Sequence, residues 1–199
     1  MKSQAVHART ILTESSISEI DLYLNPYIGC THSCVYCCVE YMKSFSGHGS
    51  DRWGEFVDYK ANAVELLARE IDKARGKNVM VGSLTDAYQP IEKQCELTRQ
   101  CLGLLAAHRV ATFILTKSDL VLRDTELLAG APASRVGMTL AFADDRCRQA
   151  FEPRTCATSR RIAALTELHD AGCTTFAFVG PIIPDLSDLD GIFAMLAPA

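Results

Sequence analysis

The sequence contains no long hydrophobic run. No stretch approaches the roughly 20 apolar residues that a membrane-spanning helix requires. Residues Met1 to Asp21 are polar and mixed in charge, without the apolar centre of a signal peptide. We therefore expect a cytoplasmic protein.

The sequence also lacks an excess of charge of either sign. Its 20 Lys and Arg residues nearly balance its 24 Asp and Glu residues, which gives a formal net charge of −4. General nucleic-acid binding usually needs a basic surface, so the overall charge gives it no support. A local basic surface around Arg154, Arg160 and Arg161 is still compatible with the sequence. Hydrophobic residues make up 48%, as in an ordinary soluble globular protein.

No low-complexity linker or change in composition divides the chain. Its 199 residues fit one domain that is large enough to bury a core. We expect a single domain over residues 1–199, in which residues 1–20 form an N-terminal extension. The chain stops in what looks like the helix after a fifth strand, so we expect a domain that is short or truncated after its fifth β/α unit.

Short apolar runs that are rich in β-branched residues predict buried strands. Between them, apolar residues recur at the spacing of amphipathic helices. Strand and helix patterns alternate five times, and because parallel crossovers are right-handed, this order predicts an α/β fold with a parallel sheet and outer helices. The expected strands are 22–24, 78–83, 111–116, 135–140 and 174–179, and the expected helices include 64–74, 97–105, 119–129 and 162–168.

Polar residues follow each expected strand at the point where the strand ends. The carboxyl ends of parallel strands meet at one edge of a sheet, where the helix N-termini also converge, and such folds bind ligands there. The sequence therefore gathers its candidate chemistry on one rim. The segments concerned are the cysteine loop after the first strand, residues 83–86, residues 116–118, Thr139 and residues 181–184.

Four of the nine cysteines lie between Cys30 and Cys38. Cytoplasmic thiols stay reduced, so this grouping indicates metal or redox chemistry before disulfides. The motif Cys30-Thr-His-Ser-Cys34-Val-Tyr-Cys37 supplies three thiolates, which would leave one iron of a [4Fe–4S] cluster without a protein ligand. Zinc is the weaker alternative, because a structural zinc site has four ligands, typically in two spaced pairs, and no second pair follows. Cys38 is a possible fourth ligand, strained by its position next to Cys37.

The cysteine spacing, with Tyr36 just before the third cysteine, resembles the motif of the radical S-adenosylmethionine (SAM) superfamily. Other segments resemble its spore-photoproduct-lyase-like branch, often labelled DNA repair photolyases, and together they cover nearly the whole chain. They are Asn25-Pro-Tyr-Ile-Gly-Cys30, Gly82-Ser-Leu-Thr-Asp86, Tyr88-Gln-Pro-Ile-Glu92, Leu97-Thr-Arg99, residues 115–124, Glu152-Pro-Arg154 and Pro181-Ile-Ile-Pro184.

This resemblance implies a partial open (β/α) barrel of about 5–6 parallel strands, with a [4Fe–4S] cluster at its C-terminal rim. Cys30, Cys34 and Cys37 would hold the cluster, and SAM would chelate the open iron. Reduction by an electron donor such as a flavodoxin or ferredoxin would produce a 5′-deoxyadenosyl radical that abstracts hydrogen from a substrate. The resemblance therefore implies a lyase-like radical SAM enzyme. Its substrate stays open, with a nucleic-acid lesion as one candidate.

The same resemblance implies which residues contact SAM, although it assigns no catalytic residue. Hydroxyl and carboxylate acceptors suit the methionine amine, and a cation suits its carboxylate. The residues are Tyr36 near the adenine, Ser83, Thr85 and Asp86 at the amine, Lys117 at the carboxylate, and Thr139 at the ribose or carboxylate.

Several of these residues have a simpler alternative role. Asp86 could be an ordinary turn or cap residue. Lys117 could belong to a solvated loop that caps the next helix, and Thr139 could be an ordinary strand residue. We also expect Glu152-Pro-Arg154 and Arg160-Arg161 to start and decorate a helix rather than touch substrate, and His32 to be either loop surface or a hydrogen-bonding neighbour of the cluster.

One departure from the family pattern concerns the reaction. Spore photoproduct lyases carry a hydrogen-donating cysteine just ahead of the Thr-Ser-Asp segment after the second strand, and this chain has Ser83-Leu84 there. We therefore do not expect repair of the spore thymine dimer. Two other classes remain open, namely a non-catalytic iron–sulfur or zinc-binding module and a DNA-binding repair component. Cys156 has no functional explanation from the sequence.

Overall fold

A six-stranded sheet forms the centre of the protein, in a computed structural model that describes residues 1–131 and 133–197. The order is β2-β3-β6-β7-β8-β9, and every neighbouring pair is parallel except the antiparallel pair β2–β3. All five expected strands are present. The strands are β2 (Leu12–Glu14), β3 (Leu22–Leu24), β6 (Asn78–Val81), β7 (Ala111–Thr116), β8 (Arg135–Leu140) and β9 (Thr174–Val179).

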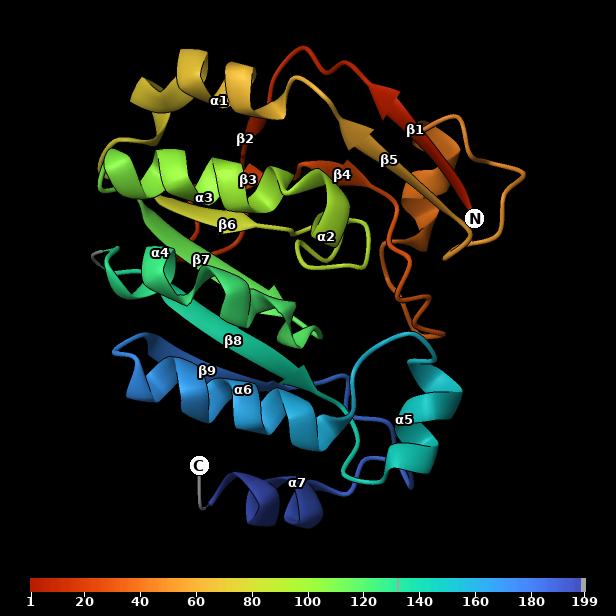
Figure 1. Cartoon of the computed structure of the whole chain (residues 1–199). Coiled ribbons are helices and arrows are strands. Elements are labelled where there is room, and N and C mark those ends of the chain that lie inside the picture. Colours follow the sequence, from red (N-terminus) through yellow and green to blue (C-terminus); the bar gives the residue numbers. More distant parts are fainter. Residues whose placement is uncertain (132, 198–199) are drawn as a thin grey trace.

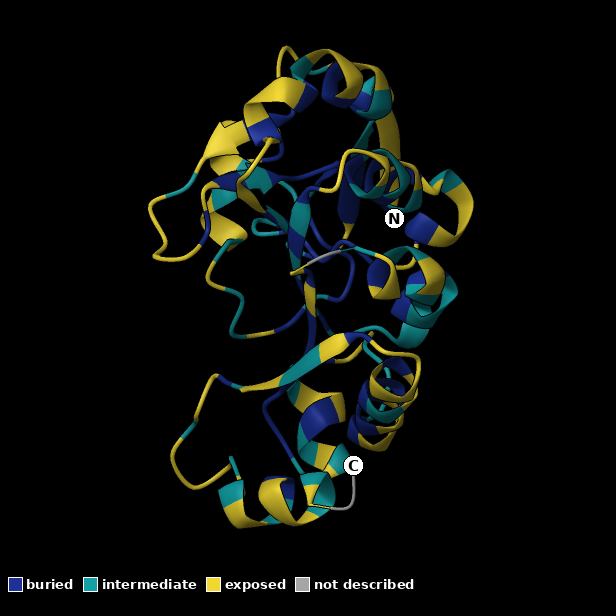
Figure 2. Ribbon diagram, turned by 90° about the vertical axis from the view of Figure 1, so that its left-hand side faces the viewer, coloured by how far each residue is buried: buried dark blue, intermediate teal, exposed yellow. Residues whose placement is uncertain are grey.

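Helices join the parallel strands and lie side by side on one face of the sheet, as Figures 1 and 2 show. This arrangement confirms the predicted α/β class with a mostly parallel sheet and outer helices. Gly172, at φ +90°, follows the C-cap residue Ala171 of α6 and ends that helix before β9. The helices are α1 (Ala63–Glu70), which continues as the 3₁₀ helix η2 (Ile71–Ala74), α3 (Leu97–Ala107), η3 (Asp119–Asp124) with α4 (Thr125–Ala129), α6 (Thr158–Asp170) and α7 (Leu189–Leu196).

The core lies between the sheet and these helices. Strand side chains such as Val81, Ile114 and Met138 have no exposed surface, and neither do the helix side chains Leu67 and Leu105 that pack against them. Burial of apolar surface is the main favourable term in folding, and the helical spacing of the apolar residues is what puts them on the sheet side. Cys101 and Cys173 are buried in this core, whereas Cys95, which we expected to be buried like them as a small apolar side chain, is half-buried.

A second, three-stranded sheet has no counterpart in the sequence-based prediction. Its order is β1-β5-β4, formed by β1 (Lys2–Val6), β5 (Phe56–Lys60) and β4 (Tyr27–Ile28). Strands β1 and β5 are parallel, and β4 and β5 are antiparallel. Residues 1–20 therefore contribute two strands, β1 and β2. Because β4 directly precedes the cysteine loop and β5 follows it, this small sheet fixes both ends of the loop.

Three short helices were also not expected. They are η1 (Glu40–Phe45), α2 (Glu92–Cys95) and α5 (Asp145–Phe151). The N-cap of α5 is Asp144, whose carboxylate accepts a hydrogen bond from the Arg146 amide. At the other end of this helix, the Phe151 carbonyl accepts a hydrogen bond from the Val35 amide at 2.8 Å. Helix α5 therefore contacts the cysteine loop from the side opposite the small sheet (Figure 1).

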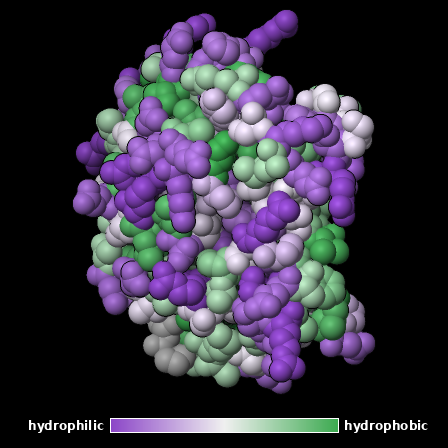
Figure 3. Space-filling view, turned by 45° about the vertical axis from the view of Figure 1, so that its right-hand side comes forward, coloured by the Kyte–Doolittle hydropathy of each residue, from purple (hydrophilic) through white to green (hydrophobic). Residues whose placement is uncertain are grey.

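The surface is largely hydrophilic on the face shown in Figure 3, with smaller hydrophobic areas between charged side chains. Within the described ranges, none of the helices has the length and apolar character needed to cross a membrane.

Candidate iron–sulfur site

The three thiols of the cysteine motif are shielded from solvent to different degrees. Cys30 and Cys34 are buried and Cys37 is half-buried, whereas the neighbouring Cys38 is exposed, and all four are free thiols. The loop backbone turns just before Cys30, at Gly29 with φ +84°. This conformation favours glycine. A side chain at Gly29 would also collide with β5, because a Cβ there would lie 2.7 Å from the ring and the carbonyl oxygen of Phe56.

The environment of the thiols opposes isolated thiolates. Burial raises the pKa of Cys30, and the nearby Asp86 carboxylate raises it further. Burial also raises the pKa of Cys34, to about 12, against the charge of Lys117, which lowers it. Because thiolates are the form that binds metals, a metal that enters this loop must displace protons and supply positive charge. Iron would provide that charge, so the donor set fits an iron–sulfur cluster.

The thiols are not arranged around a single point. Among residues 1–131 and 133–197, no three His, Cys, Asp or Glu side chains converge closely enough to bind one metal ion. A mononuclear zinc site requires such convergence. In a [4Fe–4S] cluster held by cysteines, each thiolate binds a different iron, so the thiols stand further apart. Three buried or half-buried thiols on one loop are soft ligands of the kind that hold iron–sulfur clusters.

Asp86 lies at the end of β6 and is nearly buried. Its Oδ1 accepts hydrogen bonds from Thr116 Oγ1 at 2.6 Å and the Tyr88 amide at 2.9 Å. Its Oδ2 accepts from the Lys117 amide at 2.9 Å and lies 3.2 Å from His32 Nε2. Burial raises the pKa of Asp86, but these partners, led by His32, outweigh it and hold the pKa well below the usual range. The four contacts occupy the roughly four acceptor positions of a carboxylate. This is the arrangement expected if Asp86 is a turn or cap residue, the alternative to a SAM contact.

His32 lies within the cysteine loop and is buried, so it is not a surface residue. Its Nδ1 lies 3.1 Å from the Arg154 carbonyl oxygen, and its Nε2 lies 3.2 Å from Asp86 Oδ2, outside hydrogen-bond geometry. Both ring nitrogens therefore face oxygen acceptors. The imidazole ties the cysteine loop to the end of β6 on one side and to the segment after α5 on the other.

Thr85 and Gln89 support the residue before the first cysteine. Thr85 Oγ1 donates to the Gly29 carbonyl at 2.6 Å and accepts from Gln89 Nε2 at 2.7 Å. Gln89 has no exposed surface, and its Oε1 accepts from the Thr31 amide at 2.9 Å. Thr85 therefore holds the backbone of the loop in this structure. Ser83 is half-buried, and its Oγ accepts a hydrogen bond from Asn25 Nδ2 at 3.0 Å.

Tyr36 is tied to a buried ion pair that the sequence did not predict. Its hydroxyl donates to Glu152 Oε1, and Glu152 Oε2 pairs with the guanidinium of Arg161. Glu152 and Arg161 have no exposed side-chain surface, unlike the helix-surface residues that we expected. Arg161 also donates to the Thr139 carbonyl at 2.8 Å. Only the Glu-Pro-Arg segment, noted for its resemblance, gave a sign of this arrangement.

Lys117 projects toward the same group of side chains. Its Nζ lies 5.6 Å from the centre of the Tyr36 ring, in cation–π range. Its carbonyl accepts a hydrogen bond from the Cys156 thiol at 3.2 Å, which gives Cys156 a structural role. The structure thus brings Lys117, Tyr36 and the three motif thiols together at the carboxyl end of the sheet, while residues 181–184 beyond β9 are mostly exposed.

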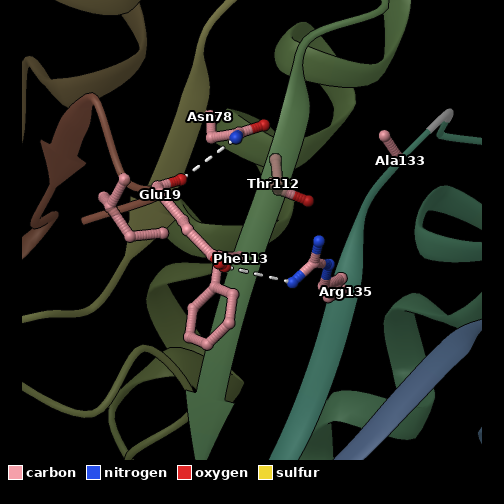
Figure 4. A pocket seen from close by; sticks show the side chains of 7 residues that line it. Glu19, Asn78, Thr112, Phe113, Ala133 and Arg135 are labelled. Atoms are coloured by element: carbon pink, nitrogen blue, oxygen red, sulfur yellow. Dashed lines mark hydrogen bonds and ion pairs between the residues drawn. The ribbon is translucent and has the colours of Figure 1, made fainter. Parts of the chain in front are cut away.

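A small pocket lies at the opposite end of the strands (Figure 4). Asn78 and Arg135, the first residues of β6 and β8, line it together with Glu19. The Glu19 carbonyl accepts from Asn78 Nδ2 at 3.0 Å, and its carboxylate lies 3.5 Å from the Arg135 guanidinium. The amino-terminal edge of parallel strands usually serves stability rather than binding, so this pocket is separate from the cysteine site.

Comparison with known proteins identifies the family of the chain. The model of the radical SAM superfamily matches residues 24–194. An uncharacterized protein of Methanocaldococcus jannaschii is 34% identical over 193 residues, which are 97% of this chain and 72% of that relative. A radical SAM Nα-GlyT isomerase of Pseudomonas phage M6 is 26% identical over 195 residues, 96% of this chain and 38% of the isomerase.

Solved structures of spore photoproduct lyase share the fold. One variant of that lyase superposes with a TM-score of 0.73 at 18% identity, over 98% of this chain and 57% of the lyase. Another, with bound AdoMet and dinucleoside spore photoproduct, gives 0.70 at 15% identity and covers 55% of the lyase. The chain thus spans little more than half of these structures. With a family model that matches most of its length, the chain belongs to the radical SAM superfamily, whose members use a [4Fe–4S] cluster and SAM as cofactors.

Proposed function

We propose that this protein holds a [4Fe–4S] cluster through Cys30, Cys34 and Cys37 and cleaves SAM reductively. The observation that carries the proposal is the burial of Cys30 and Cys34 and the half-burial of Cys37 at the carboxyl edge of the sheet, next to Lys117. Cys38 is exposed and stays outside the proposed ligand set. When bound, the cluster and SAM supply a reduced iron centre and a 5′-deoxyadenosyl group that can abstract hydrogen.

We place SAM on the rim beside these thiols. Lys117 offers the methionine carboxylate a cation, and Tyr36 offers the adenine a ring whose hydroxyl is fixed by Glu152. Ser83 follows the carboxyl end of β6, Thr139 lies near the carboxyl end of β8 on the other side of β7, and both offer hydroxyl groups. Thr85 and Asp86, whose acceptors are engaged by protein donors, hold the rim in shape.

The substrate is the finer part of the proposal. A structure of spore photoproduct lyase contains a dinucleoside photoproduct, and that likeness supports a nucleic-acid lesion. The net charge of −4 gives no added support, and Ser83-Leu84 replaces the segment where the lyases carry a hydrogen-donating cysteine. We therefore propose a lesion or other substrate different from the spore thymine dimer. The cluster also needs an external reductant, such as a flavodoxin or ferredoxin, and a cytoplasmic location suits both.

The first experiment is anaerobic reconstitution with iron and sulfide, followed by dithionite reduction and an assay of 5′-deoxyadenosine formed from SAM. Cys34→Ala removes a buried ligand, and Cys38→Ala is the matched control on the same loop. We expect product from the wild type and from Cys38→Ala, and none from Cys34→Ala. A bound cluster without product would favour the non-catalytic module, and tight zinc without iron would refute the proposal.

A further inference from the structure

Gln89 lies in the segment Tyr88-Gln-Pro-Ile-Glu92, which resembles the family but contains none of the proposed ligands or SAM contacts. Its side chain has no exposed surface. A buried side-chain amide needs partners for its two N–H donors and for its carbonyl oxygen. The partners that Gln89 has in this structure give the segment a role at the cysteine loop.

The amide of Gln89 bridges the two residues on either side of Cys30. Its Oε1 accepts hydrogen bonds from the Thr31 amide at 2.9 Å and from the Thr31 hydroxyl at 3.2 Å. Its Nε2 donates to the Gly29 carbonyl at 3.1 Å and to Thr85 Oγ1 at 2.7 Å. These four contacts use both donors and both acceptor positions of the amide. One side chain therefore fixes the carbonyl before the first candidate ligand and the N–H after it.

The backbone of Gln89 is itself held in a turn. Its amide donates to the Asp86 carbonyl at 3.3 Å, and its carbonyl accepts from the Glu92 amide at 2.9 Å. Pro90 follows directly, and a proline restricts the backbone of the residue before it. The contact with the cysteine loop thus starts from an ordered turn beyond the end of β6.

The same segment also holds the chain that leads to Cys30. Glu92 has no exposed surface, accepts a hydrogen bond from the Tyr27 hydroxyl, and pairs with Arg123 at 2.6 Å. Tyr27 belongs to β4 and lies three residues before Cys30. Residues 27, 29 and 31 are therefore all bonded to residues 89 and 92, which brackets the first candidate ligand on both sides.

We propose that Gln89 is a positioning residue for Cys30, which holds this ligand in place independently of the cluster and slows loss of the cluster. The inference rests on the proposed function, because it takes Cys30 as a ligand. A ligand whose backbone is already fixed loses little conformational freedom when it binds. Groups that orient metal ligands typically contribute about 10-fold to 100-fold to metal affinity.

Two substitutions separate the two arms of this contact. Gln89→Met has a similar length and makes no hydrogen bond. Gln89→Glu keeps an acceptor for Thr31 but places an oxygen against the Gly29 carbonyl oxygen. Asn62→Leu and Asn62→Asp are the matched controls, because the Asn62 amide bonds both backbone groups of Ala8, at 3.0 and 2.9 Å, in a part of the chain that holds no candidate ligand.

The first measurement is amide hydrogen exchange at Thr31 in the protein without cluster. We expect slow exchange in the wild type and in Gln89→Glu. In Gln89→Met exchange should be roughly fivefold to tenfold faster, as loss of one hydrogen bond predicts. This measurement needs no bound cluster and no activity.

The second measurement is the rate at which reconstituted protein releases iron to a chelator, together with the electron paramagnetic resonance spectrum of the reduced cluster. We expect both Gln89 variants to release iron roughly tenfold to a hundredfold faster than wild type and to show an altered spectrum. A purely structural role would lower stability without changing the spectrum. Both Asn62 variants should therefore match the wild type in iron release and in spectrum.

The outcomes separate this inference from the proposed function. Wild-type protein that binds no cluster would refute the proposed function and the role of Cys30 as a ligand with it. A bound cluster whose iron release and spectrum are the same in the Gln89 variants as in the controls would overturn the role of Gln89 alone. If Gln89→Met does not fold, Gln89→Glu and the wild type decide. A Thr31 amide that exchanges in the wild type as fast as in an unfolded peptide would overturn the inference.

Discussion

Arg161 and Glu152 form an ion pair in which neither side chain has any exposed surface. Arg161 belongs to α6, and Glu152 directly follows α5. Glu152 also accepts a hydrogen bond from the hydroxyl of Tyr36, which lies in the cysteine loop. A charge pair in the interior is costly to break, because the remaining partner stays buried without its counter-charge. This pair therefore joins the outer helices to the loop that carries the candidate ligands.

Replacement of Arg161 tests this role in stability. We expect Arg161→Gln to lower the free energy of unfolding by about 3–5 kcal/mol, because the Glu152 carboxylate would lose its buried partner. Urea denaturation of the protein without cluster is the measurement. Arg160→Gln is the matched control, since its neighbouring guanidinium pairs with Asp119 at an exposed site, and such pairs contribute below about 1 kcal/mol. Equal losses in the two variants would contradict the special role of the buried pair.

Replacement of Tyr36 tests its contact with SAM. Tyr36→Phe keeps the ring and loses only the hydrogen bond to Glu152, whereas Tyr36→Leu loses the ring. We expect Tyr36→Leu to weaken the Kd for SAM by roughly fivefold to a hundredfold, in line with the effect of removing one aromatic stack on a base. Tyr36→Phe should change it by a small factor. Isothermal titration of the reconstituted protein gives both values, and an unchanged Kd in Tyr36→Leu would place adenine elsewhere.

Gly29 and Gly47 offer a matched pair of glycines. Both have φ above +80°, but a side chain at Gly29 would collide with Phe56, and one at Gly47 would meet open space. We expect Gly29→Ala to lose bound iron and to be destabilised by about 1–3 kcal/mol beyond the backbone strain that both variants share. Iron analysis and thermal unfolding of the two variants measure this. Full iron content in Gly29→Ala would show that the turn tolerates a shift of β5.

Asp86 can be distinguished as a brace or as a SAM ligand. Its carboxylate holds Thr116, the Lys117 backbone and His32. If it acts as a brace, Asp86→Asn should lose iron even when SAM is absent, because the amide donates where the native carboxylate accepts. If it contacts the methionine amine directly, the cluster should remain and only the Kd for SAM should rise. Iron content and SAM affinity, measured separately, decide between the two.

His48 predicts a pH dependence of stability away from the thiols. Burial lowers its pKa, but hydrogen bonds and charge from Asp51 and Asp58, at 2.7 and 2.9 Å, outweigh it and raise the pKa above 6.5. Because the folded-state pKa is raised, this stabilisation is complete below the unfolded value and is lost as the pH rises through the folded-state value. The advantage of wild type over His48→Gln should therefore shrink across a pH series that starts at about 6 and rises through the raised pKa of His48.

The control for this experiment keeps the charge and removes the stacking. His48 lies flat on Phe56, with ring centres 3.9 Å apart. Phe56→Leu should lower the free energy of unfolding by a similar amount at every pH in the range, since it leaves both carboxylates beside His48. An advantage of wild type over His48→Gln that stays constant with pH would contradict the assigned ion pairs.

The parts of the fold that were predictable are those with local periodicity. Strands β3, β6, β7 and β8 of the main sheet and the helices α1, α3 and α6 each carry their own apolar pattern, and their burial followed from it. Strand β2 was not predicted, and the prediction that β9 is buried was wrong, because β9 lies at the edge of the sheet and is half-buried or exposed. The small sheet was not predictable in this way, because β1 is mostly polar and exposed, and it pairs with a segment that begins at Phe56. Its pairing depends on long-range contacts that leave no periodic pattern in either strand.

In the candidate site, too, the residues of a local motif were predictable and those brought in by tertiary packing were not. The cysteine spacing identified Cys30, Cys34 and Cys37 as ligands from the sequence, and these assignments stay predictions. Gln89 and Glu152 were missed, because each contacts the cysteine loop from a distant segment and is an ordinary residue type in its own neighbourhood. Their positions follow from tertiary packing of the loop between the small sheet and α5.

The pairing of β4 with β5 holds the two ends of the loop between them, residues 29–55, side by side. Tyr27 and Ile28 pair with Tyr59 and Asp58, so the chain leaves and re-enters the body of the protein at one place. Because the strand pairing already holds the two ends of the loop together, most of the entropic cost of closing the loop is met by folding of the small sheet. If air destroyed a bound cluster, only the residues within this loop would then lose their order. Reconstitution with iron and sulfide would not require the main sheet to unfold.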